Sequence, residues 1–327
     1  MHPASVDRLD RRAFLGALTL ALLASPAAAQ PSRVPPRIGW ISEEPLPDPF
    51  LDGFLEGLRK LGYVEGQNVV VDVRSGTRES LRAAIADLVR SNVVFIVARG
   101  PAIQAIRAVT GVQVLFAISG DPVELGIAKS VGRPGGTFTG ITFLSLEVAG
   151  KRVDLLRQAV PQIRTLAALA NVNHPGELSE RGATEAAARN LGLAMKHAPF
   201  GTLAELDAAL GTVRDARADA MVVFPDGPTM LARAKIAQYA VAHRLPTMFG
   251  WSEFCDAGGL MSYGANQRET YVRLASHADK LLRGAKPADL PIEQPTRFEL
   301  VINLATAKLL ALTIPQSLVL RADRVIE

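Results

Sequence analysis

The stretch IGWISEEPLPDPFLDGFLEGLRKLGYVEGQNVVVDV, residues 38–73, contains a complete strand–helix–strand unit. Its two ends, 38–41 and 69–73, are short apolar runs of the kind that form buried strands. Between them, hydrophobic residues recur at the spacing of an amphipathic helix, namely Phe50, Leu51, Phe54, Leu55, Leu58 and Leu61. This order predicts two parallel strands joined by a helix.

The same alternation continues along the chain. Further strands are predicted at 93–97, 114–118, 137–141, 165–170, 195–198, 220–224, 246–249, 258–263 and 298–302. Further helices are predicted at 81–89, 103–109, 123–131, 148–160, 203–213, 230–243, 271–282 and 305–312, with another ending near Leu191. Because the pattern restarts after Leu144, the chain is expected to form an α/β fold of two Rossmann-like lobes, each with a parallel sheet covered on both faces.

The boundaries of the two lobes follow from this alternation. The first lobe is assigned to residues 37–145 plus 257–288, and the second to residues 146–256 plus 289–327. The segment near the end of the chain carries prolines at 287, 291 and 295, which favour an extended crossing between the lobes. No linker rich in Pro, Gly or Ser separates the two units, so crossing strands are expected to connect them.

Composition narrows the functional classes. The chain has 327 residues, of which 48% are hydrophobic and 21% charged, a globular composition. Its single cysteine, Cys255, cannot form an intramolecular disulfide, and no Cys/His spacing predicts a metal site. The net charge of +4 comes from dispersed residues, which does not indicate a nucleic-acid-binding protein. We expect no metal, no cofactor and a monomer.

The first 29 residues have the layout of a signal peptide. A charged segment is followed by the apolar run 13–24 and by small residues ending at Ala29. The apolar run is too short to span a membrane, and no later segment offers eighteen uninterrupted apolar residues. Residues 1–29 are therefore predicted to be removed near Ala29, which places the mature protein in the periplasm. The alternative is an ordinary N-terminal helix, but no second polar face supports it.

The export route is indicated by a pair of arginines. Arg11 and Arg12, followed by Ala-Phe-Leu, resemble a twin-arginine signal, which exports folded proteins. Asp10 departs from that motif, where Ser or Thr is usual. Export favours proteins that act outside the cytosol and disfavours roles that need NAD, ATP or DNA.

Candidate ligand contacts come from loops that follow predicted strands, because ligands of parallel α/β sheets bind beyond the carboxyl ends of the strands. These candidates are Ser42, Arg99, Gly100, Pro101, Ser119, Asn173, Asp226 and Trp251. Pro101 at a helix start and the neighbouring Arg99 suit an anion, although Arg99 is also compatible with a solvated loop.

Two of these candidates have a second interpretation. Asp226 directly follows an apolar strand, where its carboxylate suits a ligand ammonium or hydroxyl group, but it also suits a helix cap. Trp251 suits an aromatic wall for a flat ligand or packing between the lobes. Asp121, followed by Pro122, is explained by capping alone.

Catalytic motifs are missing from the sequence. There is no G-x-S-x-G elbow for a serine nucleophile, and the five histidines have no recognised catalytic spacing. The glycine-rich stretch 132–140 leads into a strand and so does not predict a dinucleotide loop. A binding protein is therefore favoured over an exported α/β enzyme. A periplasmic sensor that presents its bound state to a membrane receptor remains an alternative.

Several segments together resemble a known family. They are GYVEGQNV (62–69), SGDPVELG (119–126), RPGGTFTGITFLSLE (133–147), GGLMSYG (258–264) and QPTRFELVINLATAKLLALTIPQSLVLRADRVIE (294–327). The mature chain thereby resembles ABC transporter substrate-binding proteins, including tryptophan- and tyrosine-binding members. The resemblance implies a type I periplasmic-binding-protein architecture with three crossings between lobes, a ligand cleft between them, and two partners, a membrane permease and its ATPase.

The resemblance also bears on individual residues. In amino-acid-binding members a Thr-Pro pair at a helix start helps to hold the ligand carboxylate, and an Asp after a strand of the second lobe contacts the ligand. Asp226 matches the latter. Gly100 and Pro101 match the former except that Gly replaces Thr and Arg99 stands beside it. The resemblance therefore implies a small, carboxylate-bearing or amino-acid-like ligand.

Overall fold

The computed structural model describes residues 34–43, 46–143 and 145–327, in which the strands form one five-stranded and one seven-stranded sheet. We call each sheet with its helices the first and the second lobe, respectively. The predicted signal peptide, residues 1–29, lies outside the described residues. Over the part of the chain that is described, no helix combines the length and apolar character needed to cross a bilayer.

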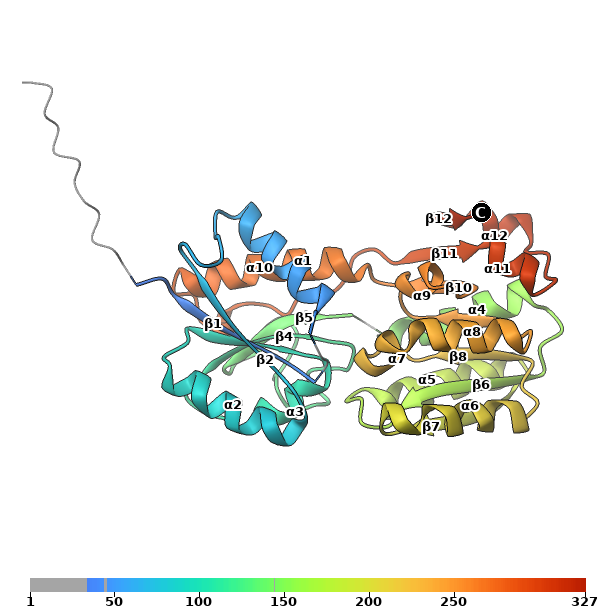
Figure 1. Cartoon of the computed structure of the whole chain (residues 1–327), viewed down its shortest axis with the longest axis horizontal. Helices are drawn as coiled ribbons and strands as arrows, with labels where there is room; N and C mark the ends of the chain where they lie inside the picture. Colours follow the sequence, from blue (N-terminus) through green and yellow to red (C-terminus); the bar gives the residue numbers. More distant parts are fainter. Residues whose placement is uncertain (1–33, 44–45, 144) are drawn as a thin grey trace, which may run out of the picture. The chain divides into compact units, whose positions relative to one another are not determined.

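The first lobe is a fully parallel sheet of order β2-β1-β3-β4-β5 (Figure 1). Its strands are β1 (Arg37–Ser42), β2 (Val70–Ser75), β3 (Phe95–Arg99), β4 (Gln113–Ile118) and β5 (Phe138–Thr142). Its helices are α1 (Pro49–Lys60), α2 (Arg78–Arg90), α3 (Ile103–Ile106) and α10 (Gln267–Leu282), with the short 3-10 helices η1 (Gly100–Ala102) and η3 (Pro287–Asp289). Helices α1 and α10 pack on one face and α2 and α3 on the other.

Helix α1 shows why this segment folds as predicted. Asp48 caps it, because its Oδ1 atom accepts a hydrogen bond from the backbone N–H of Phe50 at 3.0 Å, and Pro49 occupies the first turn. The periodic apolar residues Phe50, Phe54 and Leu58 are buried against the sheet. The helix is thus fixed by a cap at its start and by hydrophobic burial along one face.

The second lobe has the strand order β12-β11-β10-β9-β8-β6-β7. Its strands are β6 (Thr165–Asn171), β7 (Ala194–Phe200), β8 (Ala220–Val223), β9 (Thr247–Phe249), β10 (Met261–Gly264), β11 (Glu299–Asn303) and β12 (Arg324–Ile326). Its helices are α4 (Ser145–Ala159), α5 (Glu177–Asn190), α6 (Leu206–Asp215), α7 (Gly227–Leu231), α8 (Arg233–Ala242), α9 (Glu253–Asp256), α11 (Leu304–Leu309) and α12 (Gln316–Val319), with the 3-10 helix η2 (Leu203–Glu205).

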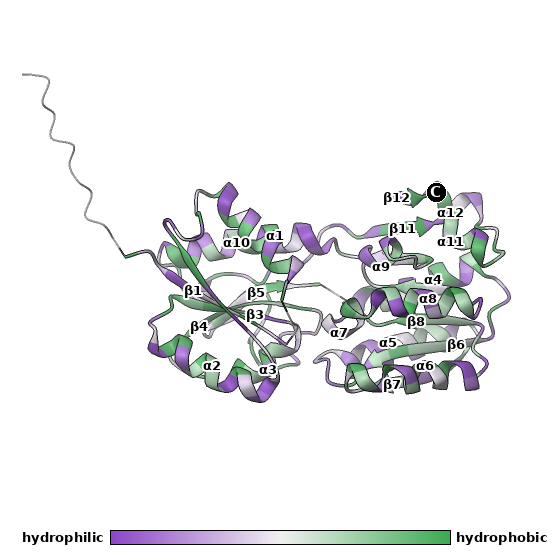
Figure 2. Cartoon of the chain, in the orientation of Figure 1, coloured by the Kyte–Doolittle hydropathy of each residue, from purple (hydrophilic) through white to green (hydrophobic). Residues whose placement is uncertain are grey.

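Hydrophobic side chains occupy the space between sheet and helices in both lobes. Helices α6 and α8 contribute to the core on one face of the second sheet, and α4, α5 and α11 to the core on the other. In Figure 2 the strands are predominantly hydrophobic, whereas the helices alternate between hydrophobic and hydrophilic residues. Coverage of both faces explains why the central strands are continuous apolar runs.

The chain passes between the lobes three times: between β5 and α4, between β10 and α10, and between η3 and β11. The third crossing contains the proline-rich segment that predicted an extended passage. It is also attached to the edge of the first sheet, because Glu293 donates its backbone N–H to the Gly140 carbonyl at 2.8 Å and its carbonyl accepts from the Thr142 N–H at 3.0 Å.

The structure differs from the sequence-based expectations in several places. Residues 123–131 form turns rather than a helix, because Gly126 adopts a positive φ of 69° that ends any helical turn. The predicted helix 230–243 is divided between α7 and α8. Strand β11 runs antiparallel to β10, so the second sheet is not uniformly parallel. Within the range 257–288 that was assigned to the first lobe, β10 belongs to the second sheet and only α10 packs on the first.

The close approach of α1 and α10 gives a test of this packing. A Cβ atom on Gly57 would lie 2.4 Å from the Val272 carbonyl oxygen, whereas one on Gly182, within α5, would meet nothing within 4 Å. We expect Gly57→Ala to lower the free energy of unfolding by about 1–3 kcal/mol through overpacking. The matched Gly182→Ala should raise it by up to about 1 kcal/mol through helix propensity. Urea unfolding measures both, and a Gly57→Ala variant as stable as the parent would contradict the packing.

Candidate functional site

A pocket lies where loops of the first lobe meet loops of the second. Its lining residues come from both lobes: Phe50, Arg99, Gly100, Pro101, Ala117, Ile118, Ser119, Phe143, His174, Asp226, Gly227, Trp251, Gln267 and Tyr271. Loops at the carboxyl ends of β3, β4, β6, β8 and β9 supply many of these residues. The position is the one expected for a ligand of parallel α/β sheets.

Six of the eight predicted contacts line this pocket: Arg99, Gly100, Pro101, Ser119, Asp226 and Trp251. The structure places Ser42 and Asn173 outside the lining. Ser42 is buried at the end of β1. Asn173 uses its side chain locally, since its Nδ2 donates to the Gly201 carbonyl at 2.9 Å. Asn173 therefore orders its own loop, and its neighbour His174 reaches the pocket instead.

Arg99 is held in place at the end of β3. Its guanidinium carbon lies 4.2 Å from the centre of the Phe50 ring, a cation–π contact. Its Nε atom lies 3.6 Å from Oδ2 of Asp48, the residue that caps α1. The Trp40 indole N–H donates to the same Oδ2 at 3.2 Å. These contacts exclude the solvated-loop interpretation, because the Arg99 residue is only 5% exposed.

The segment after Arg99 forms a shorter helix than the one predicted at 103–109. Gly100 has a positive φ of 50°, and the residues that follow form one 3-10 turn and the four-residue helix α3. So short a helix has little macrodipole. The Arg99 side chain is therefore the main positive group on this side of the pocket.

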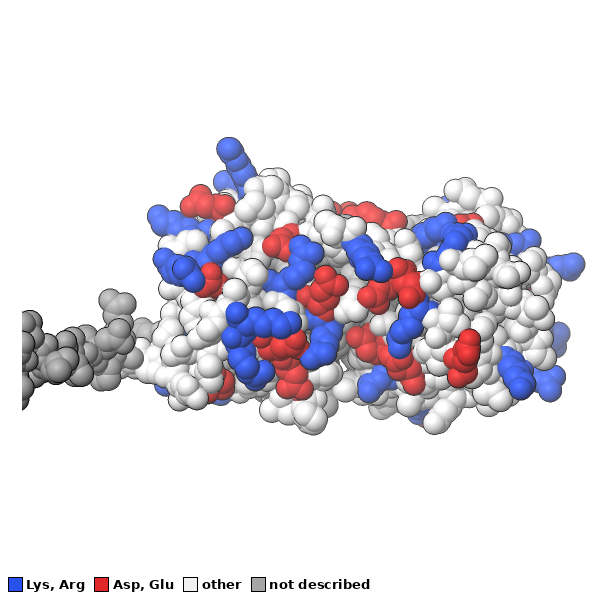
Figure 3. Space-filling view, turned by 90° about the horizontal axis from the view of Figure 1, so that it is seen from above, with Lys and Arg blue, Asp and Glu red and all other residues white. Residues whose placement is uncertain are grey.

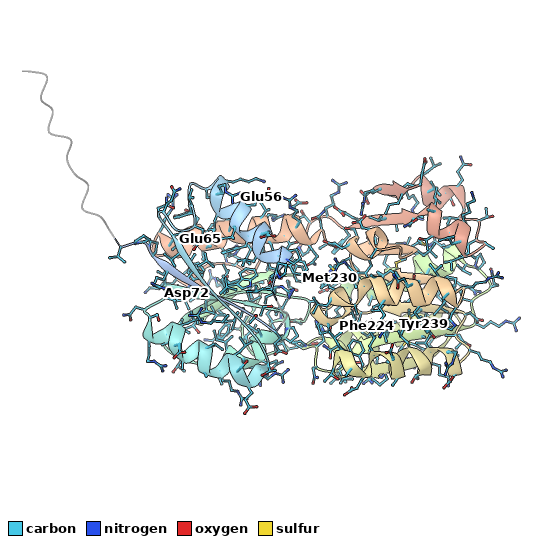
Figure 4. All side chains as sticks on the ribbon, in the orientation of Figure 1. Glu56, Glu65, Asp72, Phe224, Met230 and Tyr239 are labelled. Carbon is cyan, nitrogen blue, oxygen red and sulfur yellow. The ribbon has the colours of Figure 1, made fainter. Side chains whose placement is uncertain are left out.

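Asp226 lies on the opposite side, at the start of α7. Its Oδ1 atom accepts a hydrogen bond from the Thr229 backbone N–H at 2.7 Å, so it caps the helix and lines the pocket at the same time. Phe224, just before this turn, and Met230, within α7, are labelled in Figure 4. Asp226 thus both caps α7 and lines the pocket.

A cluster of buried charged groups lies close to Asp226. Arg152 Nη1 donates to Glu180 Oε1 at 2.6 Å, and its Nε donates to the Tyr263 carbonyl at 2.8 Å. Burial, together with the nearby charges of Asp226 and Glu177 and against the opposing effect of Arg152, raises the pKa of Glu180 to about 7. Of these carboxylates only that of Asp226 lines the pocket, where it favours a cationic group on the ligand.

Four aromatic rings form the apolar wall of the pocket. Trp251 of the second lobe meets Phe50 and Phe143 of the first lobe edge-on, with ring centres 6.3 Å and 6.1 Å apart. Tyr271 contacts the same two rings, at 5.1 Å and 6.1 Å. Trp251 thus lines the pocket and packs between the lobes, which confirms its packing role, while its contact with a ligand stays a prediction.

His174 and Ser119 join the two lobes at the edge of the pocket. Ser119 Oγ and His174 Nε2 are 2.6 Å apart, and the Gly176 backbone N–H donates to His174 Nδ1 at 3.2 Å. Burial lowers the pKa of His174 to about 4, so the imidazole is neutral. Sequence reasoning missed His174 because a lone histidine in a loop carries no motif. The aromatic residues Phe50, Phe143 and Tyr271 also line the pocket but were not among the predicted contacts, because buried aromatic residues of a core have the same sequence pattern.

Arranged in this way, the pocket offers a positive group and a negative group on opposite sides of an aromatic wall. A small ligand with a carboxylate and an ammonium group would satisfy both charges in a poorly hydrated space. Neutral polar groups of Ser119 and Gln267 add hydrogen-bonding capacity. The chemistry of the lining therefore suits reversible binding of a zwitterion.

The buried ion pair gives a testable consequence for stability. Replacing Arg152 by Leu leaves the Glu180 carboxylate without its counter-charge, so we expect a loss of about 3–5 kcal/mol at pH 8. The loss should shrink as the pH falls, because the pKa of Glu180 is about 7 with Arg152 in place and rises further without it, so the buried carboxyl group takes up a proton. The double variant Arg152→Leu/Glu180→Leu should recover most of it. Chemical unfolding at pH 5 and pH 8 measures this, and a double variant as unstable as the single one would contradict it.

Comparison with known proteins agrees with this geometry. A tyrosine-binding protein of Clostridioides difficile (strain R20291) is 21% identical to this chain over 280 residues, which are 84% of this chain and 79% of that protein. An ABC domain from Streptococcus pneumoniae, solved in complex with L-Trp, superposes with a TM-score of 0.82 at 25% identity, over 90% of this chain and 100% of that one. A conserved domain protein from Vibrio cholerae also gives 0.82, at 22% identity, over 90% and 100% of the two chains.

The fold is accordingly the two-lobed type I periplasmic-binding-protein fold that the resemblance implied. The family model described as ABC transporter substrate binding protein matches residues 39–326, which include both sheets and the whole pocket lining. This chain therefore belongs to the ABC transporter substrate-binding protein family.

Proposed function

We propose that this chain is the periplasmic solute-binding component of an ABC-type importer and captures a small zwitterionic or carboxylate-bearing ligand between its lobes. The observation that carries the proposal is the pair of buried, opposite charges on the two sides of the pocket, Arg99 in the first lobe and Asp226 in the second. Each lobe supplies one charge, so the complete site exists only when both lobes contact the ligand.

Export and delivery complete the proposal. Residues 1–29 act as the signal peptide, cleaved near Ala29, and the loaded protein docks on a membrane permease driven by its ATPase. On the face shown in Figure 3, basic and acidic side chains are interspersed without a large block of one sign. This distribution supports a small-molecule ligand rather than a nucleic acid.

An amino-acid-like ligand is favoured by two observations. The structural relative from Streptococcus pneumoniae was solved with L-Trp, and the relative from Clostridioides difficile is named a tyrosine-binding protein. The rings of Phe50, Phe143, Tyr271 and Trp251 provide an aromatic wall for the ligand side chain. Arg99 then faces the ligand carboxylate and Asp226 its ammonium group.

A thermal-shift screen of the mature protein tests the ligand class. The panel contains the twenty L-amino acids and their deaminated 2-oxo and 2-hydroxy analogues. The analogues keep the carboxylate but lack the ammonium group, so the comparison shows whether binding requires the ammonium group. A ligand at 100 times its Kd should stabilise the protein by about 2.7 kcal/mol through mass action. We expect intact amino acids to raise the melting temperature more than analogues without the ammonium group. A panel that leaves the melting temperature unchanged would exclude this ligand class.

An uptake assay distinguishes import from sensing. A strain that lacks this protein should take up less of the ligand if the protein serves an importer, and should take up the same amount if the protein is a sensor.

The two charged residues are tested by charge-removing substitutions. Arg99→Ala and Asp226→Asn should each cost about 2–5 kcal/mol of binding free energy, or roughly thirty-fold to several thousand-fold in Kd. Asn is chosen at 226 because it still caps α7. Calorimetry with the ligand from the screen measures the loss.

Two matched variants control for general charge effects. Asp215→Asn removes an exposed carboxylate at the end of α6, outside the pocket, and Arg107→Ala removes an exposed guanidinium just beyond α3. Each should change the binding free energy by less than about 1 kcal/mol. If the site variants lose no more affinity than these controls, Arg99 and Asp226 do not contact the ligand.

A further inference from the structure

Two segments touch across the lobes beside the pocket. Residues 119–124 of the first lobe face residues 174–179 of the second, and Ser119 Oγ lies 2.6 Å from His174 Nε2. At the other end of the contact, Ser179 donates its hydroxyl to Glu124 Oε2 at 2.7 Å. We call this pair of segments the lobe contact.

The middle of the lobe contact is closely packed. A Cβ atom on Gly120 would lie 3.3 Å from the Gly176 backbone nitrogen, and one on Gly176 would lie 2.9 Å from the Gly120 Cα. The two backbones approach this closely only because neither residue has a side chain. The lobe contact therefore requires the closed arrangement of the lobes and is lost when they separate.

The hydrogen-bond directions at His174 follow from its two neighbours. The Gly176 N–H donates to Nδ1, so this nitrogen carries no hydrogen in the neutral ring. The proton then sits on Nε2, which donates to Ser119 Oγ. The Ser119 hydroxyl hydrogen is thereby directed away from His174, and Ser119 lines the pocket. A carboxylate or carbonyl of the ligand can accept it.

We propose that His174 is a positioning residue that orients the Ser119 hydroxyl toward the ligand and, through the lobe contact, makes closure depend on a neutral imidazole. This inference rests on the proposed function, because it concerns the same pocket. The residue acts only in the closed protein, where both segments meet. It therefore links ligand recognition to closure of the lobes.

The linkage has a defined sign. In the closed protein burial holds the pKa of His174 near 4, whereas in the open protein the exposed ring should return toward its ordinary value of 6.5. Closure must then release a proton below pH 6.5, so affinity is full above that pH and falls as the pH decreases toward 4. Arg99 and Asp226 line the same pocket as His174, and Glu177, Asp121 and Glu124 lie on the segments of the lobe contact; burial, rather than any of these charges, lowers the pKa of His174.

A pH series of binding constants tests the proposal, with L-tryptophan as the probe and calorimetry from pH 5 to pH 8. The parent should bind about ten-fold more weakly at pH 5.5 than at pH 7.5. His174→Gln retains an N–H donor near the Nε2 position, so it should bind within about three-fold of the parent at pH 7.5 and lose most of the pH dependence. Glu180, whose pKa is also raised into this range, remains unchanged in this variant.

Two further variants separate positioning from a merely structural role. His174→Asn loses the Nε2 donor and should bind about ten-fold more weakly at pH 7.5. Ser119→Ala should bind more weakly at every pH but retain the pH dependence, because His174 is still buried on closure. A pH-independent parent, a His174→Gln variant with the full pH dependence, or a His174→Asn variant as tight as the parent would overturn the proposal.

A scattering experiment on the ligand-free protein distinguishes a failure of the proposed function from a failure of the proposal for His174. If L-tryptophan gives no binding heat with the parent, the amino-acid ligand is contradicted and the lobe contact is tested on the ligand-free protein by small-angle scattering. The radius of gyration of the parent should then increase between pH 7.5 and pH 5, and that of His174→Gln should not. Equal radii for the parent and His174→Asn at both pH values would overturn the lobe contact.

Discussion

Parallel pairing of strands is the constraint on which the site depends. Because parallel strands all point the same way, their carboxyl ends lie along one edge of each sheet, and the loops that follow them gather there. The two edges supply Arg99 and Ser119 from the first lobe and His174, Asp226 and Trp251 from the second. Residues more than a hundred positions apart in the chain thus form a single pocket.

The charges of the pocket are supported by partners outside it. Arg99 contacts Asp48, which in turn is fixed by Trp40 and by the first turn of α1. Asp226 is fixed by capping α7 and lies close to the Arg152–Glu180 pair. These partners limit the movement of both groups before a ligand arrives, and such preorganisation reduces the entropy lost on binding.

Much of the fold was predictable because strand and helix periodicity is a local property. The strand at 38–41 and the helix from Phe50 to Leu61 lie within a residue or two of β1 and α1. The antiparallel pairing of β10 with β11 was not predictable, because the direction of a strand in a sheet depends on tertiary contacts. The helix expected at 123–131 failed because backbone conformation at Gly126 overrode apolar spacing.

The site was predictable in part for the same reason. Residues directly after strands, such as Arg99 and Asp226, were found from topology alone. Phe143 and Tyr271 were missed, because an aromatic residue that faces a pocket has the same sequence signature as one in a core. Asn173 and His174 lie in the same loop, and the sequence does not show which of the two side chains faces the pocket. Only the three-dimensional structure shows that the Asn173 amide donates its hydrogen bond to the Gly201 carbonyl instead.

The attachment of the third crossing to the first sheet determines the mechanics of closure. Glu293 is fixed to Gly140 and Thr142, so residues up to 293 move as a lever with the first lobe. The pivot of this crossing therefore lies between Glu293 and Glu299, the start of β11. Asn266, in the second crossing, donates its amide to Glu299 at 2.7 Å, so the two pivots are adjacent. A rotation of one lobe against the other would therefore have to twist these two crossings together, within the few residues that separate their points of attachment.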